Sequence, residues 1–286
     1  MLGTLGQHSV MPRNTSENSM TAIVIVHSAA GFFIAADGKL TMDDKSRHKA
    51  SLQNLAMETE EQQKIFQVAS PRETLAYAVR GTVRDPLGFD LMKITETQIK
   101  AISARRFDEM YPFLTSLGGR VNKEINEARR RGTLEPFSEE SQKTRTGGWP
   151  IAYLHFCGYF KKEPCLAEIE FSHRRQVSQF YIHWPMLRAT HFYGSEIVRQ
   201  NMYGDETGTA HPDSRFAEFV KGVPPHLSFE NAQQFTRGYI EACGSQLGLE
   251  VDKPFCKAIG GHIHMATITP SNGFAWAIEP LWKEIP

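Results

Sequence analysis

The sequence has few cysteines, and they stand far apart. Four occur in 286 residues, at positions 157, 165, 243 and 256. No two of them have the close spacing of a zinc-binding Cys-x-x-Cys motif, and four scattered cysteines do not make a disulfide scaffold. We therefore expect small buried thiols in a reducing compartment.

The sequence also lacks an excess of charge of either sign and a long apolar run. Lys and Arg number 32, as do Asp and Glu, which argues against a nucleic-acid binder that works by global positive charge. The most apolar stretch, residues 21–36, is interrupted by polar residues and glycine, and it is too short to span a bilayer. Residues 1–20 have no continuous apolar segment of signal-peptide length. We expect a soluble cytoplasmic protein that binds neither nucleic acid nor membrane.

The remaining composition is that of an ordinary globular protein. Apolar residues make up 41% of the chain, enough for a substantial core. Residues 1–20 are polar and aperiodic and predict a disordered extension, whereas 21–286 show no internal repeat and no boundary. We expect a single domain over residues 21–286, with a surface insertion at 39–63 and a Gly/Pro-rich loop at 204–225.

Hydrophobic periodicity predicts the elements of this domain. Apolar and β-branched runs predict strands at 21–27, 32–36, 64–68, 75–79, 151–159, 166–171, 179–184, 188–193, 262–269 and 274–278. Three- and four-residue spacing predicts helices at 96–117, ended by Gly118-Gly119, at 120–131, and after a capping Ser228. Strands, helices, strands, helix and strands in that order indicate an α+β fold, with two antiparallel sheets and helices outside them.

The first predicted strand pair carries the motif that matters most for function. Its sequence, TAIVIVHSAAGFFIAADG, begins at Thr21, bends at Gly31 and ends at Asp37-Gly38, sixteen residues after the threonine. This stretch resembles the opening of a proteasome β-type subunit, and equally the peptidase subunit of the bacterial two-component ATP-dependent protease. Both are N-terminal-nucleophile (Ntn) hydrolases, so the resemblance implies a four-layer αββα sandwich.

Further motifs follow in the order that the resemblance requires. Lys64-Ile65-Phe66 resembles the family's Lys-Ile-hydrophobic motif, and the strand that ends at Gly81 resembles the one carrying its oxyanion glycine. Residues 152–171 resemble the paired middle strands, and Gly194-Ser195 resembles the Gly-Ser before the next helix. The likeness covers most of residues 21–278.

The resemblance implies a role for each of five residues. Thr21 would become the first residue of the mature chain and attack a peptide carbonyl through its hydroxyl, while its α-amine moves the proton. An α-amine suits this task because its ordinary pKa is ~7.7–8.0, whereas that of lysine is ~10.4. Lys64 would depress the amine and hydroxyl pKa values, and Asp37 would keep Lys64 charged. The Gly81 N–H would meet the oxyanion, and Ser195 would orient the amine or a water.

The resemblance also implies a way of working. The protein would be a threonine-type endopeptidase in a self-compartmentalising homo-oligomeric ring, acting on peptides or unfolded proteins, with no metal or organic cofactor. An ATPase partner is left open. Two alternatives remain: a catalytically inactive ring or scaffold subunit of the same fold, and an Ntn amidase that cleaves a small amide.

Two departures from the family bear on these alternatives. The family commonly has an aspartate three positions before a serine ahead of its last strand, where this chain has Cys256 and Ile259. Met20 precedes Thr21, where self-processing subunits usually have glycine. Thr21 would be exposed by initiation at Met20 and methionine removal, making residues 1–19 a misassigned start, or by self-cleavage of a propeptide; a retained extension would block the amine.

His262 and His264 form a separate candidate. Alternation along a strand places both rings on one face, which is a geometry that metal sites use. No third ligand stands nearby in the sequence. We therefore expect two packed or interface histidines and no metal.

Overall fold

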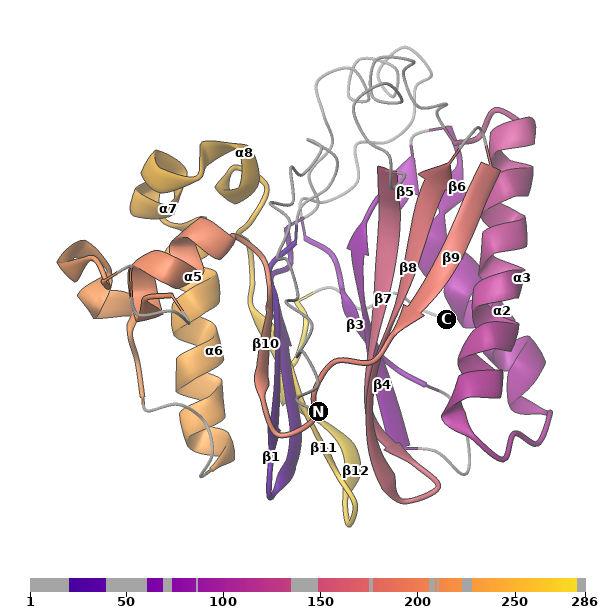
Figure 1. The fold of residues 1–286 in the computed structure, drawn as a ribbon, viewed down its shortest axis with the longest axis horizontal. Coiled ribbons are helices and arrows are strands. Elements are labelled where there is room, and N and C mark those ends of the chain that lie inside the picture. Colours follow the sequence, from indigo (N-terminus) through magenta and orange to yellow (C-terminus); the bar gives the residue numbers. More distant parts are fainter. Residues whose placement is uncertain are drawn as a thin grey trace, which may run out of the picture.

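The computed structural model describes residues 21–39, 61–68, 74–85, 87–134, 149–174, 177–205, 209, 211–222 and 228–281. The predicted extension at residues 1–20 and most of the predicted insertion at 39–63 lie outside the described residues. Figure 1 shows two sheets facing each other with helices on both outer sides. This is the four-layer αββα sandwich that the sequence predicts.

The first sheet contains the strand pair that begins near Thr21. Its strands are antiparallel and lie in the order β10, β1, β2, β11, β12. Their bounds are β1 Ile23–Ser28, β2 Gly31–Ala36, β10 Thr190–Tyr193, β11 His264–Thr269 and β12 Gly273–Ile278. Gly31, at the bend of the β1–β2 hairpin, has φ +134°, and an added Cβ there would lie 2.4 Å from the carbonyl oxygen of Ile268. Only glycine fits this turn.

The second sheet is also antiparallel, in the order β3, β4, β7, β8, β9. Its strands are β3 Ile65–Gln67, β4 Thr74–Gly81, β7 Trp149–Phe160, β8 Glu163–Arg174 and β9 Val177–His183. A small separate ladder pairs β5 Arg84–Asp85 with β6 Phe89–Asp90. All ten predicted strands are present. The strands β7 and β8 are longer than predicted, whereas β3, β10 and β11 are shorter, so His262 precedes β11 and does not lie in it.

The helices form the two outer layers. Against the second sheet lie α2 Leu91–Ser103 and α3 Met110–Arg130, and against the first sheet lie α5 Glu196–Tyr203, the 3₁₀ helix η1 Ser214–Phe219, α6 Phe229–Gly244, α7 Gln246–Val251 and α8 Lys253–Cys256 (Figure 1). The predicted cap of α6 is confirmed, because Ser228 Oγ accepts the N–H of Asn231 at 3.2 Å. The region predicted as the loop 204–225 contains η1.

The predicted helix boundaries around residues 96–131 are wrong. The chain leaves the helix after Ser103, and α3 then runs through both Gly118 and Gly119. A Cβ on Gly118 would lie 2.5 Å from Cδ2 of Phe180, a residue of β9. The glycine therefore allows α3 to lie close to the sheet, and this packing outweighs its weak helix propensity.

Side chains alternate between three cores along the strands. In β4, Ala76 and Ala78 face the first sheet, whereas Tyr77 and Val79 pack in the core beneath α2 and α3. A third core lies between the first sheet and its own helices.

The four cysteines are free and buried, as expected. Each fully buried large apolar side chain contributes ~1.5–3 kcal/mol to folding.

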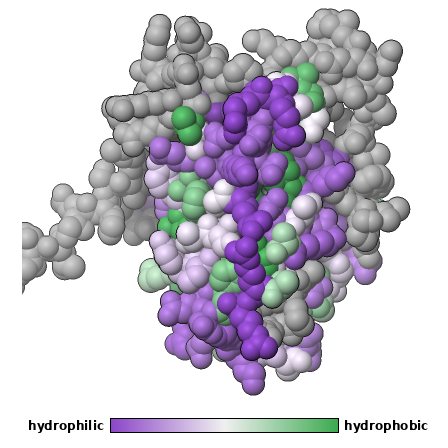
Figure 2. Space-filling model, turned by 90° about the vertical axis from the view of Figure 1, so that its right-hand side faces the viewer, coloured by the Kyte–Doolittle hydropathy of each residue, from purple (hydrophilic) through white to green (hydrophobic). Residues whose placement is uncertain are grey.

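The outer face over α2 and α3 is mainly hydrophilic, with scattered hydrophobic residues (Figure 2). Within the described part of the chain, no helix is both long enough and apolar enough to cross a lipid bilayer. The cytoplasmic location stays a prediction.

Candidate active site

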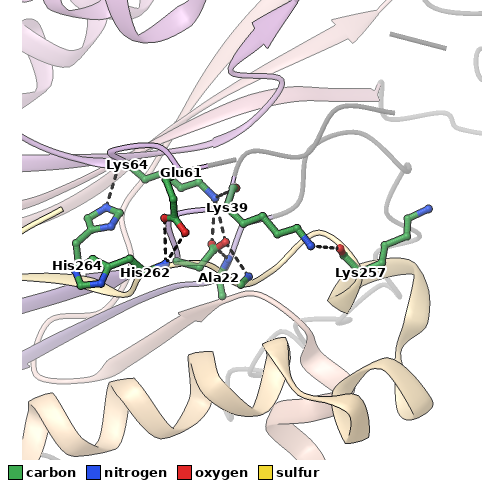
Figure 3. Close-up of polar contacts among 9 residues, drawn as sticks. Ala22, Lys39, Glu61, Lys64, Lys257, His262 and His264 are labelled. Atoms are coloured by element: carbon green, nitrogen blue, oxygen red, sulfur yellow. Dashed lines mark hydrogen bonds and ion pairs between the residues drawn. The ribbon is translucent and has the colours of Figure 1, made fainter. Parts of the chain in front are cut away.

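A buried ion pair joins the two sheets at one end of the sandwich. Asp37 directly follows β2 of the first sheet, and Lys64 directly precedes β3 of the second. Lys64 Nζ lies 3.2 Å from both carboxylate oxygens of Asp37, and the two side chains are 2% and 0% exposed. Nζ also donates to the carbonyl oxygen of Lys39 at 2.7 Å (Figure 3). The sequence predicts this pair across 27 positions of the chain.

The same carboxylate holds the backbone beside Thr21. Asp37 Oδ1 accepts the N–H of Ala22 at 2.8 Å, and the Asp37 N–H donates to the carbonyl oxygen of Ala22 at 3.1 Å. The first of these contacts appears beside Ala22 in Figure 3. Oδ2 accepts a further N–H, from Gly260, at 3.3 Å. Asp37 thus brings Lys64 and the residue next to Thr21 to one carboxylate.

Burial dominates the electrostatics of the pair. It raises the pKa of Asp37 and lowers the pKa of Lys64, because each charge loses its hydration. Their mutual attraction, and the N–H donors on Asp37, oppose these shifts. Removing either partner would therefore leave a buried charge without its counter-ion.

Thr21 is fully buried at the start of the first sheet. Its hydroxyl makes no hydrogen bond to any residue that the structure describes. In the chain as it stands, the nitrogen of Thr21 is in a peptide bond with Met20. It can serve as a basic amine only after residues 1–20 are removed.

Gly81 ends β4 on the strand next to Lys64. The N–H of Val79, two residues earlier, donates to the carbonyl oxygen of Lys64 at 3.1 Å. Gly81 has φ +103°, and an added Cβ would lie 2.5 Å from the Ile151 carbonyl oxygen and 2.6 Å from Ala152 Cα. The close approach of β7 therefore requires glycine here.

Ser195 lies at the same end of the first sheet as Thr21. Tyr193 pairs with Ile23 in the antiparallel ladder of β10 and β1. Ser195, two residues after Tyr193, and Thr21, two residues before Ile23, therefore lie at the same end of these strands. The Ser195 hydroxyl accepts the N–H of Val198 at 3.1 Å, which caps α5, and donates to Asp252 Oδ2 at 2.6 Å. Among the described residues it makes no hydrogen bond to Thr21, whose hydroxyl has none.

Asp252 is a partner of Ser195 that the sequence did not reveal. The expected aspartate position holds Cys256, which is buried with Ile259 in the core beneath the helices. The carboxylate that reaches Ser195 comes instead from four positions earlier, directly before α8. An acidic residue directly before Lys253-Pro254 could have indicated this carboxylate in the sequence. The family's aspartate–serine spacing instead indicated positions 256 and 259.

His264 is the second residue whose role was missed. Its Nε2 accepts the backbone N–H of Lys64 at 3.0 Å (Figure 3). Burial, and then the charge of Lys64, lower the pKa of His264 to about 3, so the ring is neutral and can accept this bond. The paired histidines were visible in the sequence, but nothing there connected them to Lys64.

The other histidine of the pair has separate partners. The N–H of His262 donates to both carboxylate oxygens of Glu61 at 3.0 Å, and its Nε2 donates to the Glu279 carbonyl oxygen at 2.8 Å. His262 and His264 therefore do not converge on one point. Their contacts agree with the expectation of packed histidines.

Solved structures that resemble this chain include two Anbu proteins. An Anbu (Gly-1) mutant from Hyphomicrobium sp. strain MC1 has a TM-score of 0.52 at 11% identity, covering 90% of this chain and 87% of that one. Anbu (ancestral beta-subunit) from Yersinia bercovieri has a TM-score of 0.48 at 12% identity, with 90% and 87% covered. No family model matches the sequence, and no curated protein matches it.

The first of these structures corrects the family expected from the sequence. It is an Anbu protein, which is proteasome-like but distinct from the proteasome β-type family, so the assignment to the proteasome β-type family is wrong. At 11% identity the likeness extends to the fold alone. The chain has a proteasome-like fold: a sandwich of two antiparallel sheets between layers of helices.

Proposed function

We propose that this protein is an N-terminal-threonine hydrolase that cleaves peptide bonds, with Thr21 as its nucleophile. One observation carries the proposal: the Asp37 carboxylate bonds both the Lys64 ammonium and the N–H of the residue next to Thr21. The buried Thr21 hydroxyl, which has no hydrogen bond within the described chain, supports the same conclusion. A lysine charge beside a threonine favours ionised forms of its hydroxyl and the free form of its amine.

The proposed reaction has two steps. The Thr21 oxygen attacks the peptide carbonyl while the α-amine of Thr21 takes the hydroxyl proton. The C–N bond then breaks, the amine gives its proton to the leaving nitrogen, and an ester to Thr21 remains. Water, deprotonated by the same amine, hydrolyses this ester and restores the threonine.

Two further residues support these steps in the proposal. The Gly81 N–H stabilises the oxyanion, and one such donor is worth ~3–4 kcal/mol in other enzymes. Ser195, held by Asp252, orients the Thr21 amine or the attacking water. Each step uses groups of this chain and water.

The proposal includes removal of residues 1–20, because the reaction needs a free α-amine. It also includes assembly of one domain, residues 21–286, into a homo-oligomeric ring that encloses the active sites, since the fold is proteasome-like. Peptides or unfolded chains are the proposed substrates. An ATPase partner stays an open possibility.

The decisive experiment begins with the protein made from its native gene. We expect amino-terminal sequencing and intact mass to begin at Thr21, and a threonine-directed covalent inhibitor to add its mass to that residue. Peptide turnover should fall by at least ~10³-fold in Thr21→Ala, while Thr21→Ser, which keeps a hydroxyl and an amine, should retain part of it.

Three outcomes would contradict the proposal. A retained extension with no turnover would identify an inactive subunit. Turnover of small amides without peptides would identify an amidase. Full activity in Thr21→Ala, with the fold unchanged by circular dichroism, would exclude the threonine mechanism altogether.

A further inference from the structure

A second group of chemically active side chains lies on the inward face of the second sheet. His155 of β7, Glu168 of β8 and His183 of β9 stand directly opposite one another in the strand register. Glu170 lies two residues beyond Glu168 and therefore on the same face. This is the face turned toward the first sheet, because Leu166, two residues before Glu168, belongs to the core between the sheets.

Close contacts link these four side chains in pairs, and three of them converge. His155 Nδ1 lies 3.0 Å from Glu168 Oε2, and His183 Nε2 lies 3.4 Å from Glu170 Oε2. One ligand atom each from Glu168, Glu170 and His183 all fall within 4.8 Å of one another. Around a tetrahedral ion with bonds of ~2.0–2.1 Å, ligand atoms are roughly 3.3 Å apart. Modest side-chain rotation would close the remaining distance.

We propose that Glu168, Glu170 and His183 form a binding site for a divalent transition-metal ion of the zinc type, with His155 positioning Glu168. Imidazole nitrogen and carboxylate oxygen are the ligands that zinc takes alongside thiolate. With the His183 imidazole neutral, as metal binding requires, the three ligands carry two negative charges, which one divalent ion balances.

The surroundings suit such a site. Exposure of the side chains rises across the sheet, from 0% at His155 and 6% at Glu168 to 23% at Glu170 and 49% at His183, which provides a path of entry. The Ser172 hydroxyl donates to Glu170 Oε1 and so orients that carboxylate. Supporting hydrogen bonds of this kind are typical around metal ligands.

The cluster is linked to the start of β1 through Tyr193. The ring of Tyr193 lies 3.9 Å from the ring of His155, centroid to centroid, and Tyr193 pairs with Ile23, two residues after Thr21. The metal ligands are nevertheless separate from Asp37 and Lys64. Binding of the ion therefore requires neither the threonine nor the removal of residues 1–20.

Metal titration of the full chain tests this proposal. After treatment with a chelator and dialysis, calorimetry should show one equivalent of Zn²⁺ bound, and Co²⁺ should give visible absorption bands of a low-coordinate site. Glu170→Gln and His183→Gln should each weaken Zn²⁺ binding at least tenfold, or ~1.4 kcal/mol. His183 is half exposed, so His183→Gln should leave the melting temperature of the metal-free protein unchanged.

Matched controls come from outside the cluster. Glu163→Gln and His211→Gln change an exposed glutamate and an exposed histidine, and both should bind Zn²⁺ like the unaltered protein. Thr21→Ala should also bind it normally, which separates this proposal from the proposed hydrolase. If the unaltered protein binds no Zn²⁺, or if all the variants bind it equally, the cluster is only a set of hydrogen-bonded His–Glu pairs and the proposal is wrong.

Discussion

The backbone N–H of Lys64 donates a hydrogen bond to the imidazole of His264, 200 positions away in the sequence, at 3.0 Å. Lys64 leads into the second sheet and His264 begins β11 of the first, so this bond joins the sheets beside the Asp37–Lys64 ion pair. The direction of the Lys64 side chain thus depends on a neutral histidine as well as on the aspartate.

The ion pair should matter strongly for stability. Lys64→Met leaves the Asp37 carboxylate buried without its counter-ion, so the free energy of unfolding should fall by ~3–5 kcal/mol. Urea denaturation followed by circular dichroism measures this. Lys100→Met, which breaks an exposed pair with Glu96, should change it by less than ~0.5 kcal/mol. Equal effects of the two substitutions would show that the buried pair contributes nothing special.

His264 should make stability depend on pH. Its pKa is about 3 in the folded protein against 6.5 ordinarily, so the unfolded chain binds the extra proton between these values. The contribution of the neutral His264 ring to the free energy of unfolding is complete above pH 6.5. It is lost as the pH falls toward 3, at up to ~1.4 kcal/mol per pH unit.

The matched variant is His264→Gln, which keeps an acceptor for the Lys64 N–H but does not titrate. Urea unfolding at several pH values between 4 and 7 should show a shallower loss of stability for this variant than for the unaltered protein. If the stability of both proteins fell equally with pH, protonation of His264 would not destabilise the folded protein, and the prediction would be wrong.

Two helix caps can be compared directly. Ser228→Ala removes the cap of α6 and should cost ~1 kcal/mol of stability. Ser195→Ala removes the cap of α5 and also leaves Asp252 without its hydroxyl donor, so it should cost ~1 kcal/mol more. If the two variants are equally stable, the contact between Ser195 and Asp252 adds nothing to the fold.

Alanine substitutions at two glycines can separate the cost of backbone strain from the cost of a steric clash. Gly81 and Gly88 have φ +103° and +105°, but an added Cβ clashes with β7 only at Gly81 and meets nothing within 4 Å at Gly88. Both substitutions to alanine cost backbone strain of ~1–2 kcal/mol, and Gly81→Ala adds the clash. The melting temperature of Gly81→Ala should therefore be clearly lower than that of Gly88→Ala. Equal melting temperatures would show that β7 moves aside easily.

Local sequence patterns identified most of the strands but misplaced the boundaries of two helices. Runs of apolar residues from Thr21 onward predicted the hairpin of the first sheet, because a buried strand needs little besides apolar and β-branched side chains. The end of the helix at Gly118 was mispredicted because the decisive contact, with Phe180, comes from a strand about sixty residues later. Propensity describes only the chain near a residue and says nothing of such partners.

By itself, the sequence determined the alternating apolar pattern of the strands, the two-sheet α+β architecture, and the spacing of Thr21, Asp37 and Lys64. These depend on local periodicity and on short hairpins, whose register follows from the turn. Only the tertiary structure decided that Asp252 reaches Ser195, that His264 holds Lys64, and that His155, Glu168 and His183 form one row. The first two contacts join segments 57 and 200 positions apart, which meet only because the sheets and helices pack together. The row depends on the register in which β7, β8 and β9 pair.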